Sequence, residues 1–165
     1  MNTNTKKGLA KANAPLHSWD IFMYAYKRRI ELSADLQTLQ TIQRQYNWST
    51  PAITPGYALI WLNKVVVITN TAMQVIYVTE NIFEMTGYKP GEVIGNKPSM
   101  FQGKETTLES RNIISSSVAN STHFETVIIN YKKDGTPYKC HVDGYPVFNK
   151  KGQLVNFLAF ESAVY

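Results

Sequence analysis

The sequence has very little cysteine. Cys140 is its single cysteine, so the chain cannot form an internal disulfide, and such low cysteine usage is typical of a reducing compartment. Long apolar runs are also missing, because no stretch approaches the roughly 18 consecutive apolar residues that a membrane-spanning helix requires. The first residues lack the apolar core of a secretory signal peptide. We therefore expect a cytoplasmic protein that does not bind membranes.

Patterns typical of catalytic and metal sites are missing as well. His17, His123 and His141 are scattered along the chain, and no two of them have the spacing of a metal-ligand pair. The sequence has neither a glycine-rich phosphate loop nor a nucleophile beside a recognisable base. We therefore expect no enzymatic activity and no metal site, with the histidines on the surface.

Positive charge is unevenly distributed. The net charge is +5 at pH 7, and most of the excess lies in residues 1–56. A basic surface that binds nucleic acid is expected on the folded body of a domain. The charge here instead indicates a solvated basic arm, and we expect no nucleic-acid partner.

The N-terminal part has the pattern of a leader followed by helix. Residues 1–17 are small, polar and lysine-rich, which predicts a disordered leader. Between residues 18 and 48 apolar side chains recur every three or four positions, which predicts a helical extension. Ser33 and Asp35 can cap a second helix, so a break near Leu32 is expected as an alternative to one continuous helix. Two prolines and a glycine within residues 49–56 then end the helix and mark a domain boundary.

Residues 57–165 contain strands at both ends and helices between them. Runs of β-branched and aromatic residues predict the strands, and short segments separated by glycine and proline predict the helices. The order is two strands, three helical segments and three strands, which is an α+β domain. The expected ranges are 64–69 and 74–79 for the first strands, 80–103 for short helices, 105–119 for a longer helix, and 122–132, 137–148 and 153–163 for the closing strands.

This order and four short motifs together resemble the PAS sensor domain. The motifs are Thr-Gly-Tyr at 86–88, Pro-Gly-Glu-Val-Ile-Gly at 90–95, Phe-Gln-Gly at 101–103 and Asn-Tyr-Lys-Lys-Asp-Gly at 130–135. Each motif is weak alone, but the four occur in register along the expected strands and helices. The resemblance covers residues 57–165. It implies the PAS fold, a five-stranded antiparallel sheet with short helices on one face and a pocket between them.

Within PAS domains, residues 95–103 resemble the loop of the flavin-binding LOV branch. That branch carries a Gly-x-Asn-Cys-Arg-Phe-Leu-Gln-Gly loop, whose cysteine adds to the flavin under blue light. The cysteine position is Pro98 in this chain, and the position of the arginine that follows is Ser99. Proline offers no thiolate, and losing the arginine removes a clamp for the flavin phosphate. We therefore expect no cysteine-adduct photochemistry, and the cofactor is unknown, with flavin less favoured than no cofactor.

The resemblance also assigns tentative pocket-lining residues. Gln102 and Asn130 match the LOV pattern, whereas Cys140 replaces a second asparagine and Glu161 replaces a glutamine. Gln102 and Asn130 can orient a ligand or equally satisfy the backbone of nearby loops. Glu161 either is buried, with a pKa raised toward the neutral form, or reaches water at the end of its strand.

The opposite face of the predicted sheet is unusually apolar. Side chains alternate along a strand, so the residues that point away from the pocket can be identified from the sequence. A contiguous exposed apolar surface usually contacts a partner, and the preceding helix is the obvious cover, from its own chain as core or from a second copy. We favour a homodimer. The expected partner surface comprises Trp19, Phe22, Tyr26, Val127, Ile129, Leu158 and Phe160.

The resemblance implies a non-catalytic sensory or protein-interaction module in signal transduction. Such a module acts as a homodimer or through a partner protein, for example a histidine kinase in trans as in bacterial two-component signalling. Because the chain ends directly after the last expected strand, we expect an effector either to have been removed or to act in trans. The alternative is a receptor that binds a flavin or another small planar ligand without forming a cysteine adduct.

Overall fold

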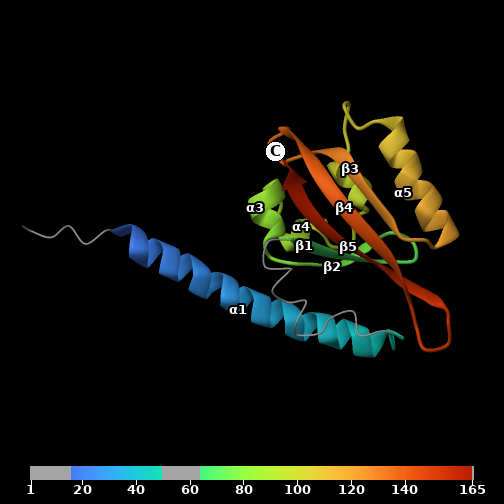
Figure 1. The fold of residues 1–165 in the computed structure, drawn as a ribbon, viewed down its shortest axis with the longest axis horizontal. Helices are drawn as coiled ribbons and strands as arrows, with labels where there is room; N and C mark the ends of the chain where they lie inside the picture. Colours follow the sequence, from blue (N-terminus) through green and yellow to red (C-terminus); the bar gives the residue numbers. More distant parts are fainter. Residues whose placement is uncertain (1–15, 50–63, 165) are drawn as a thin grey trace, which may run out of the picture.

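Five antiparallel strands form a single sheet in the order β2-β1-β5-β4-β3 (Figure 1). The fold is that of a computed structural model, which describes residues 16–49 and 64–164. The expected leader and most of the expected boundary segment therefore lie outside the described residues. The strands are β1 (Val65–Asn70), β2 (Val75–Val78), β3 (Phe124–Tyr131), β4 (Pro137–Phe148) and β5 (Leu154–Val164).

The central strand β5 pairs with β1 on one side and with β4 on the other. Side-chain alternation gives the sheet two distinct faces. We call the side that carries Asn130, Val142 and Glu161 the pocket face, and the opposite side, with Val127 and Leu158, the outer face. Cross-strand partners share a face: Val142 pairs with Glu161 on the pocket face, and Val127 pairs with His141 on the outer face. The α+β architecture and the five-stranded antiparallel sheet expected from the sequence are confirmed.

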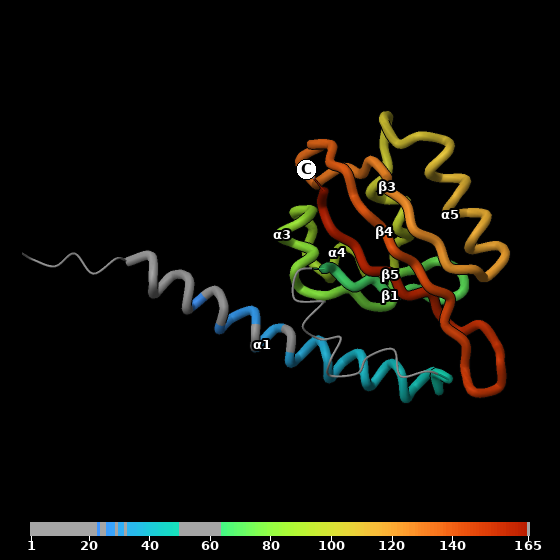
Figure 2. The backbone as a smooth tube through the Cα atoms, in the orientation of Figure 1, coloured from blue at the N-terminus to red at the C-terminus, as the bar shows by residue number. Residues whose placement is uncertain are grey.

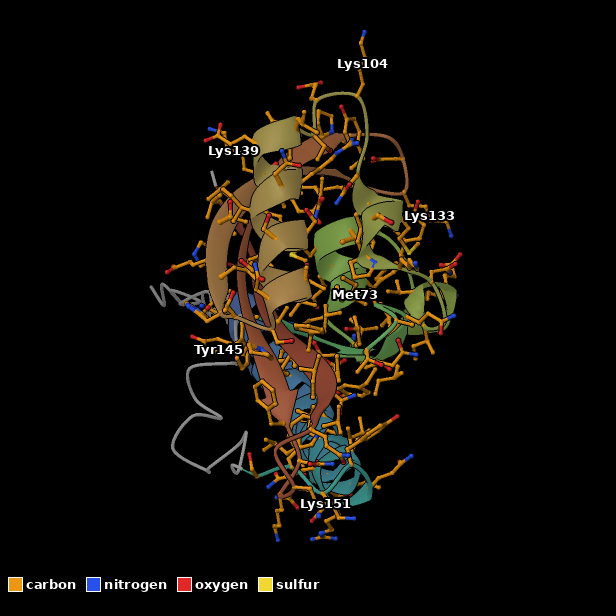
Figure 3. The ribbon with its side chains drawn as sticks, turned by 90° about the vertical axis from the view of Figure 1, so that its right-hand side faces the viewer. Met73, Lys104, Lys133, Lys139, Tyr145 and Lys151 are labelled. Carbon is orange, nitrogen blue, oxygen red and sulfur yellow. The ribbon has the colours of Figure 1, made fainter. Side chains whose placement is uncertain are left out.

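Short helices connect β2 to β3 and lie on one side of the sheet (Figure 3). The chain reverses at Gly87, which ends the first helix with φ of 77°, a left-handed conformation that glycine adopts without steric cost. Proline then occupies the first turn of each of the next two segments, where its missing N–H costs nothing. The four segments are α3 (Ile82–Thr86), α4 (Pro90–Val93), the 3₁₀ segment η2 (Pro98–Phe101) and α5 (Leu108–Asn120).

The longest of these helices, α5, begins three residues later than the sequence pattern predicts. Thr107 is its N-cap, and its hydroxyl oxygen accepts a hydrogen bond from the Ser110 amide at 3.2 Å. The expected start at Glu105 lies before this cap, and the capping hydroxyl of Thr107 sets the boundary instead. The helix ends at Ser121, which takes the left-handed conformation with φ of 53°.

The N-terminal extension is one continuous helix, α1 (Leu16–Gln45). The expected alternative of a break near Leu32 is wrong. Ser33 and Asp35 lie within the helix, and Asp35 is not a cap. Its side chain is buried and accepts a hydrogen bond from the Tyr77 hydroxyl of β2. The Asp35 side chain therefore connects α1 to the sheet instead of starting a second helix.

The C-terminal part of α1 packs on the outer face of the sheet. Leu39, which is 1% exposed, and Ile42 form an apolar cluster with Ile68 and Leu158. The cluster makes Leu158 part of the chain's own core, 5% exposed, so the expectation that Leu158 lies on a partner surface is wrong for this chain. The physical reason is that α1 folds back over β1 and β5. The intramolecular alternative therefore holds for this half of the helix.

The N-terminal part of α1 extends past the sheet (Figure 2). Its apolar side chains Met23, Tyr26 and Ile30 are 54%, 53% and 54% exposed. The side chains of Trp19 and Phe22, which we expected on the partner surface, lie outside the described residues. The helix thus has an anchored half and a projecting half.

A hydrogen-bonded side chain joins the end of α1 to the sheet. The Trp48 indole Nε1 donates to Asn156 Oδ1 at 2.8 Å, and Asn156 Nδ2 donates to the Thr69 carbonyl at 3.0 Å. Asn156 is completely buried, so its amide requires both partners. The Trp48–Asn156–Thr69 connection therefore fixes the region after α1 against β5 and β1.

We predict that Leu39→Ala destabilises the whole domain, because it leaves a cavity between α1 and the sheet. The expected loss is about 2–5 kcal/mol of unfolding free energy, measured by urea denaturation. Met23→Ala is the matched control on the exposed half of the same helix, with an expected change of about 0.5 kcal/mol or less. Equal effects of the two substitutions would contradict the anchoring of α1 on the outer face.

Candidate ligand pocket

A cavity of about 450 Å³ lies between the pocket face of the sheet and the segments η2 and α5. This volume falls within the range of ~300–1,000 Å³ that small-molecule sites occupy. Most of the lining is apolar, and Met73, labelled in Figure 3, closes one side. The apolar lining residues include Val67, Phe101, Ile114, Val118, Phe124, Ile128, Val142, Phe157 and Ala159.

The close approach of β3 to β4 helps to shape this cavity. A Cβ atom added to Gly144 would lie 2.3 Å from the Phe124 ring, so only glycine allows the ring to lie against β4 at this position. Gly144 and Phe124 are cross-strand partners, and both line the cavity. The ring consequently forms part of the wall instead of filling the space.

Pro98 and Ser99, which the resemblance assigns to the LOV cysteine and arginine positions, also line the cavity. Pro98 is the first residue of η2, and Ser99 follows it. The Pro98 side chain has no nucleophilic atom, so this position contributes only apolar surface.

Gln102 and Asn130 are brought together by backbone pairing. They form an isolated antiparallel bridge, which connects the loop after η2 to β3. Both residues line the cavity, and Asn130 is buried. The two roles expected of their side-chain amides, to orient a ligand or to satisfy loop backbone, stay predictions.

Glu161 provides the single carboxyl group among the lining residues. It is 6% exposed, and its cross-strand partners Val65 and Val142 offer no polar side-chain atoms. The Cys140 thiol donates a weak hydrogen bond to Glu161 Oε2 at 3.7 Å. Burial raises the pKa of Glu161 to about 7, and the thiol hydrogen bond offsets part of that rise. Of the two sequence-based alternatives, the structure has the buried carboxyl.

Cys140 lies behind Glu161 and does not line the cavity. It is completely buried, and burial together with the nearby Glu161 carboxyl raises the pKa of its thiol. It therefore stays protonated and cannot act as a nucleophile. Next to it, the Tyr138 hydroxyl is buried without a hydrogen bond of good geometry, and burial raises the pKa of Tyr138.

Two cationic side chains, Lys97 and Arg111, lie at the exposed edge of the cavity. The Arg111 Nη2 atom donates to the Gly103 carbonyl at 3.1 Å, which holds the guanidinium beside the loop after η2. No ion pair of either residue occurs within the described part of the chain. Sequence reasoning missed both residues. The helical spacing of Arg111 with Ile114 and Val118 was the available signal, since it places the three on one face of α5.

The outer face beyond α1 remains partly open. Val127 is 48% exposed, Ile129 and Phe160 are half-buried, and Tyr145, labelled in Figure 3, is 39% exposed. Phe160 also packs against the cluster under α1. Two of the expected partner residues, Val127 and Ile129, are therefore accessible on β3, and Phe160 is partly covered.

Histidine and carboxylate side chains pair on this open part of the outer face. The His123 Nε2 atom lies 2.8 Å from Asp143 Oδ1, and the His141 Nε2 atom lies 2.8 Å from Glu125 Oε1. Within residues 16–49 and 64–164 no three histidine, cysteine or acidic side chains are grouped so that they could hold a metal ion. In the same residues, no helix combines the length and apolar character needed to span a membrane.

Comparison with known proteins assigns this architecture. The PAS domain family matches residues 63–161, which is more than half of the chain. The chain belongs to the PAS domain family. The sheet, the short helices and the cavity between them are thus those of a PAS domain, and the chain is similar to LOV domains.

Proteins similar to this chain include a phototropin and a blue-light-activated histidine kinase. Phototropin-1A of Oryza sativa subsp. japonica is 33% identical over 90 residues, which are 54% of this chain and 10% of that protein. Blue-light-activated histidine kinase 1 of Erythrobacter litoralis is 29% identical over 83 residues, or 50% of this chain and 23% of that protein. A structure described as "Flavin Analogue Sheds Light on Light-Oxygen-Voltage Domain Mechanism" has a TM-score of 0.63 at 22% identity, covering 69% of this chain and 87% of its own. The chain spans a small part of the curated relatives' length.

We predict that Glu161 makes stability depend on pH. The pKa of Glu161 in the folded state is raised from 4.5 to about 7. The unfolding free energy that the protonated carboxyl contributes is therefore fully present below about pH 4.5 and is lost as the pH rises through about 7. Glu161→Gln should abolish this loss, which is on the order of 3 kcal/mol between pH 5 and pH 8. Urea denaturation at both pH values measures it.

The exposed Glu109 of α5 gives the matched control, since Glu109→Gln makes the same chemical change at the surface. This control should lose stability with rising pH as the unmodified chain does. Parallel stability profiles for Glu161→Gln and the unmodified chain would rule out a buried ionisable carboxyl at this position.

Proposed function

We propose that this chain is a non-catalytic PAS sensory and interaction module that works in the cytoplasm by dimerising or by contacting a partner protein. The arrangement of α1 carries the proposal. Its anchored half packs through Leu39 on the strands β1 and β5, which also form part of the cavity wall. Its projecting half exposes Met23, Tyr26 and Ile30. One rigid element therefore connects the cavity-bearing sheet to an apolar surface outside the domain.

A second copy of the chain is the partner that best fits these surfaces. Each copy has two exposed apolar regions, one on the projecting half of α1 and one at Val127 and Tyr145 on the outer face. Isolated exposed apolar side chains are common, but an exposed stripe along a helix usually contacts another surface. A symmetric dimer can cover both regions at once, because the projecting half of α1 from each copy can pack on the open outer face of the other copy.

A histidine kinase acting in trans is the partner that we propose besides a second copy. The similarity to a blue-light-activated histidine kinase supports this choice. In such a pathway α1 would contact the kinase, and the PAS module would change the kinase's activity without catalysing a reaction itself.

We predict that the protein is a dimer at micromolar concentration and that α1 is required for it. Replacing Met23 and Ile30 together by glutamate should give monomers in multi-angle light scattering, because four charges would be buried at the dimer interface. Trp19→Ala with Phe22→Ala should weaken the dimer in the same way. The control is Gln37→Glu, an exposed position on the anchored half of α1. A monomeric unmodified chain, or dimers unaffected by both double substitutions, would contradict the dimer model.

The second candidate function is a receptor that holds a flavin or another small planar ligand. The observation that favours it is the apolar cavity of about 450 Å³ with the amides of Gln102 and Asn130 at its wall. A structurally similar LOV domain whose description names a flavin analogue supports this choice of ligand class. A cavity of this size with few polar groups is typical of small-molecule sites.

We predict that any flavin held in this cavity does not form a covalent adduct under blue light. Pro98 occupies the position of the reactive thiol, and Cys140 is buried behind Glu161 with its pKa raised. The absorbance spectrum of protein mixed with riboflavin should therefore be the same before and after illumination. A reversible loss of the blue absorbance band on illumination would overturn this prediction.

A further inference from the structure

Glu161 is chemically unusual for the wall of an apolar cavity. It is nine-tenths buried, lines the cavity, and is the single acidic residue among the lining residues. An ionised carboxylate can accept about four hydrogen bonds. Among residues 16–49 and 64–164, Glu161 receives one weak hydrogen bond, from the Cys140 thiol at 3.7 Å.

The surroundings of Glu161 do not supply the missing donors. Its neighbours across the sheet, Val65 and Val142, are apolar. The Tyr138 hydroxyl on β4 is buried and makes no hydrogen bond of good geometry. The cations Lys97 and Arg111 also line the cavity, but they are exposed, and burial is the dominant influence on the Glu161 carboxyl. The acceptor capacity of Glu161 is therefore open toward the cavity.

We propose that Glu161 makes the inner wall of the cavity an acceptor site for a planar aromatic ligand with two adjacent N–H donors, as on the amidine-like edge of a 2-amino-substituted nitrogen heterocycle. This inference rests on the second candidate function, the binding of a small planar ligand in this cavity. The apolar walls bury the aromatic body, and the carboxylate accepts both donors in a bidentate pair.

The pair can form by proton transfer between Glu161 and the ligand alone. A neutral aminoheterocycle that meets the protonated Glu161 takes the carboxyl proton onto its ring nitrogen. The products are a carboxylate and an amidinium-like cation, joined by two charge-assisted hydrogen bonds. Such pairs are strongest where water is excluded, which matches the burial of Glu161.

The ionised form of Glu161 selects against ligands whose edge alternates donors and acceptors. A carboxylate accepts hydrogen bonds only, whereas a protonated carboxyl, like a glutamine amide, both donates and accepts. A ring carbonyl placed next to the Glu161 carboxylate would therefore bring two acceptors into contact. The protonated edge of an aminoheterocycle has donors only and avoids that contact, whereas a flavin carbonyl beside Glu161 requires the carboxyl to stay protonated.

The test compares two ligands of nearly equal size, 2-aminoquinoline and 2-methylquinoline. They differ by an amino group in place of a methyl group, and fluorescence titration measures the affinity of each for the full chain. We expect the amino compound to bind about ten- to 100-fold tighter, the range for hydrogen bonds to a charged group. In Glu161→Gln the preference should fall to about threefold or less.

Glu109→Gln is the matched control, because it makes the same chemical change at an exposed position of α5 that does not line the cavity. It should keep the preference of the unmodified chain. The two-ligand comparison in the unmodified chain tests the proposal without any substitution, so it does not depend on the folding of a variant.

The outcomes separate this inference from the proposed function. Equal affinities of the two quinolines in the unmodified chain, or an unchanged preference in Glu161→Gln, would overturn the acceptor site while leaving the cavity as a ligand site. If neither quinoline nor riboflavin binds at saturating concentration, the ligand-binding function itself fails, and the inference fails with it.

Discussion

The alternation of side chains along β5 is the constraint on which the rest of the structure depends. β5 is the central strand, and successive residues on it point to opposite sides of the sheet. Leu158 points to the outer face and packs under α1, whereas Ala159 and Glu161 line the cavity. A shift of one residue in the pairing of β5 would exchange these two sets. The same register therefore fixes both the anchoring of α1 and the chemistry of the cavity.

The two faces are also joined by polar contacts through the sheet. Asn156 on β5 accepts from Trp48 after α1 and donates to the Thr69 carbonyl of β1, and Thr69 lines the cavity. A second polar contact lies on the outer face itself, where Asp35 of α1 accepts from Tyr77 of β2. Buried polar contacts of this kind specify one arrangement strongly, because leaving either partner unsatisfied is costly. The position of α1 is therefore sensitive to the arrangement of the strands that form the cavity wall.

The cavity has the PAS architecture, and the resemblance to LOV domains implies four changes in its chemistry. Pro98 and Ser99 stand at the positions that the resemblance assigns to the LOV thiol and cation, and both line the cavity, with Pro98 half-buried and Ser99 exposed. Cys140 and Glu161 stand where the resemblance implies two amides, and they contact each other. The changes implied at Cys140 and Glu161 are thus coupled in space.

Much of the fold was predictable from the sequence because local rules determine it. The strand ranges, the turn at Gly87 and the prolines that begin α4 and η2 follow from residue preferences that hold in any fold. Helix boundaries were less predictable. The start of α5 depends on the Thr107 cap, and the continuity of α1 through Asp35 depends on a contact with Tyr77, 42 residues away in sequence.

The sequence by itself determined the order of elements and the PAS resemblance, since each depends on residue identity and short-range spacing. Only the tertiary structure decided that Leu158 lies under α1, that Glu161 is buried against Cys140, and that Lys97 and Arg111 lie at the same cavity. Those facts depend on the pairing of strands and helices distant in sequence. Burial and charge environment arise from that pairing, and no local pattern encodes them.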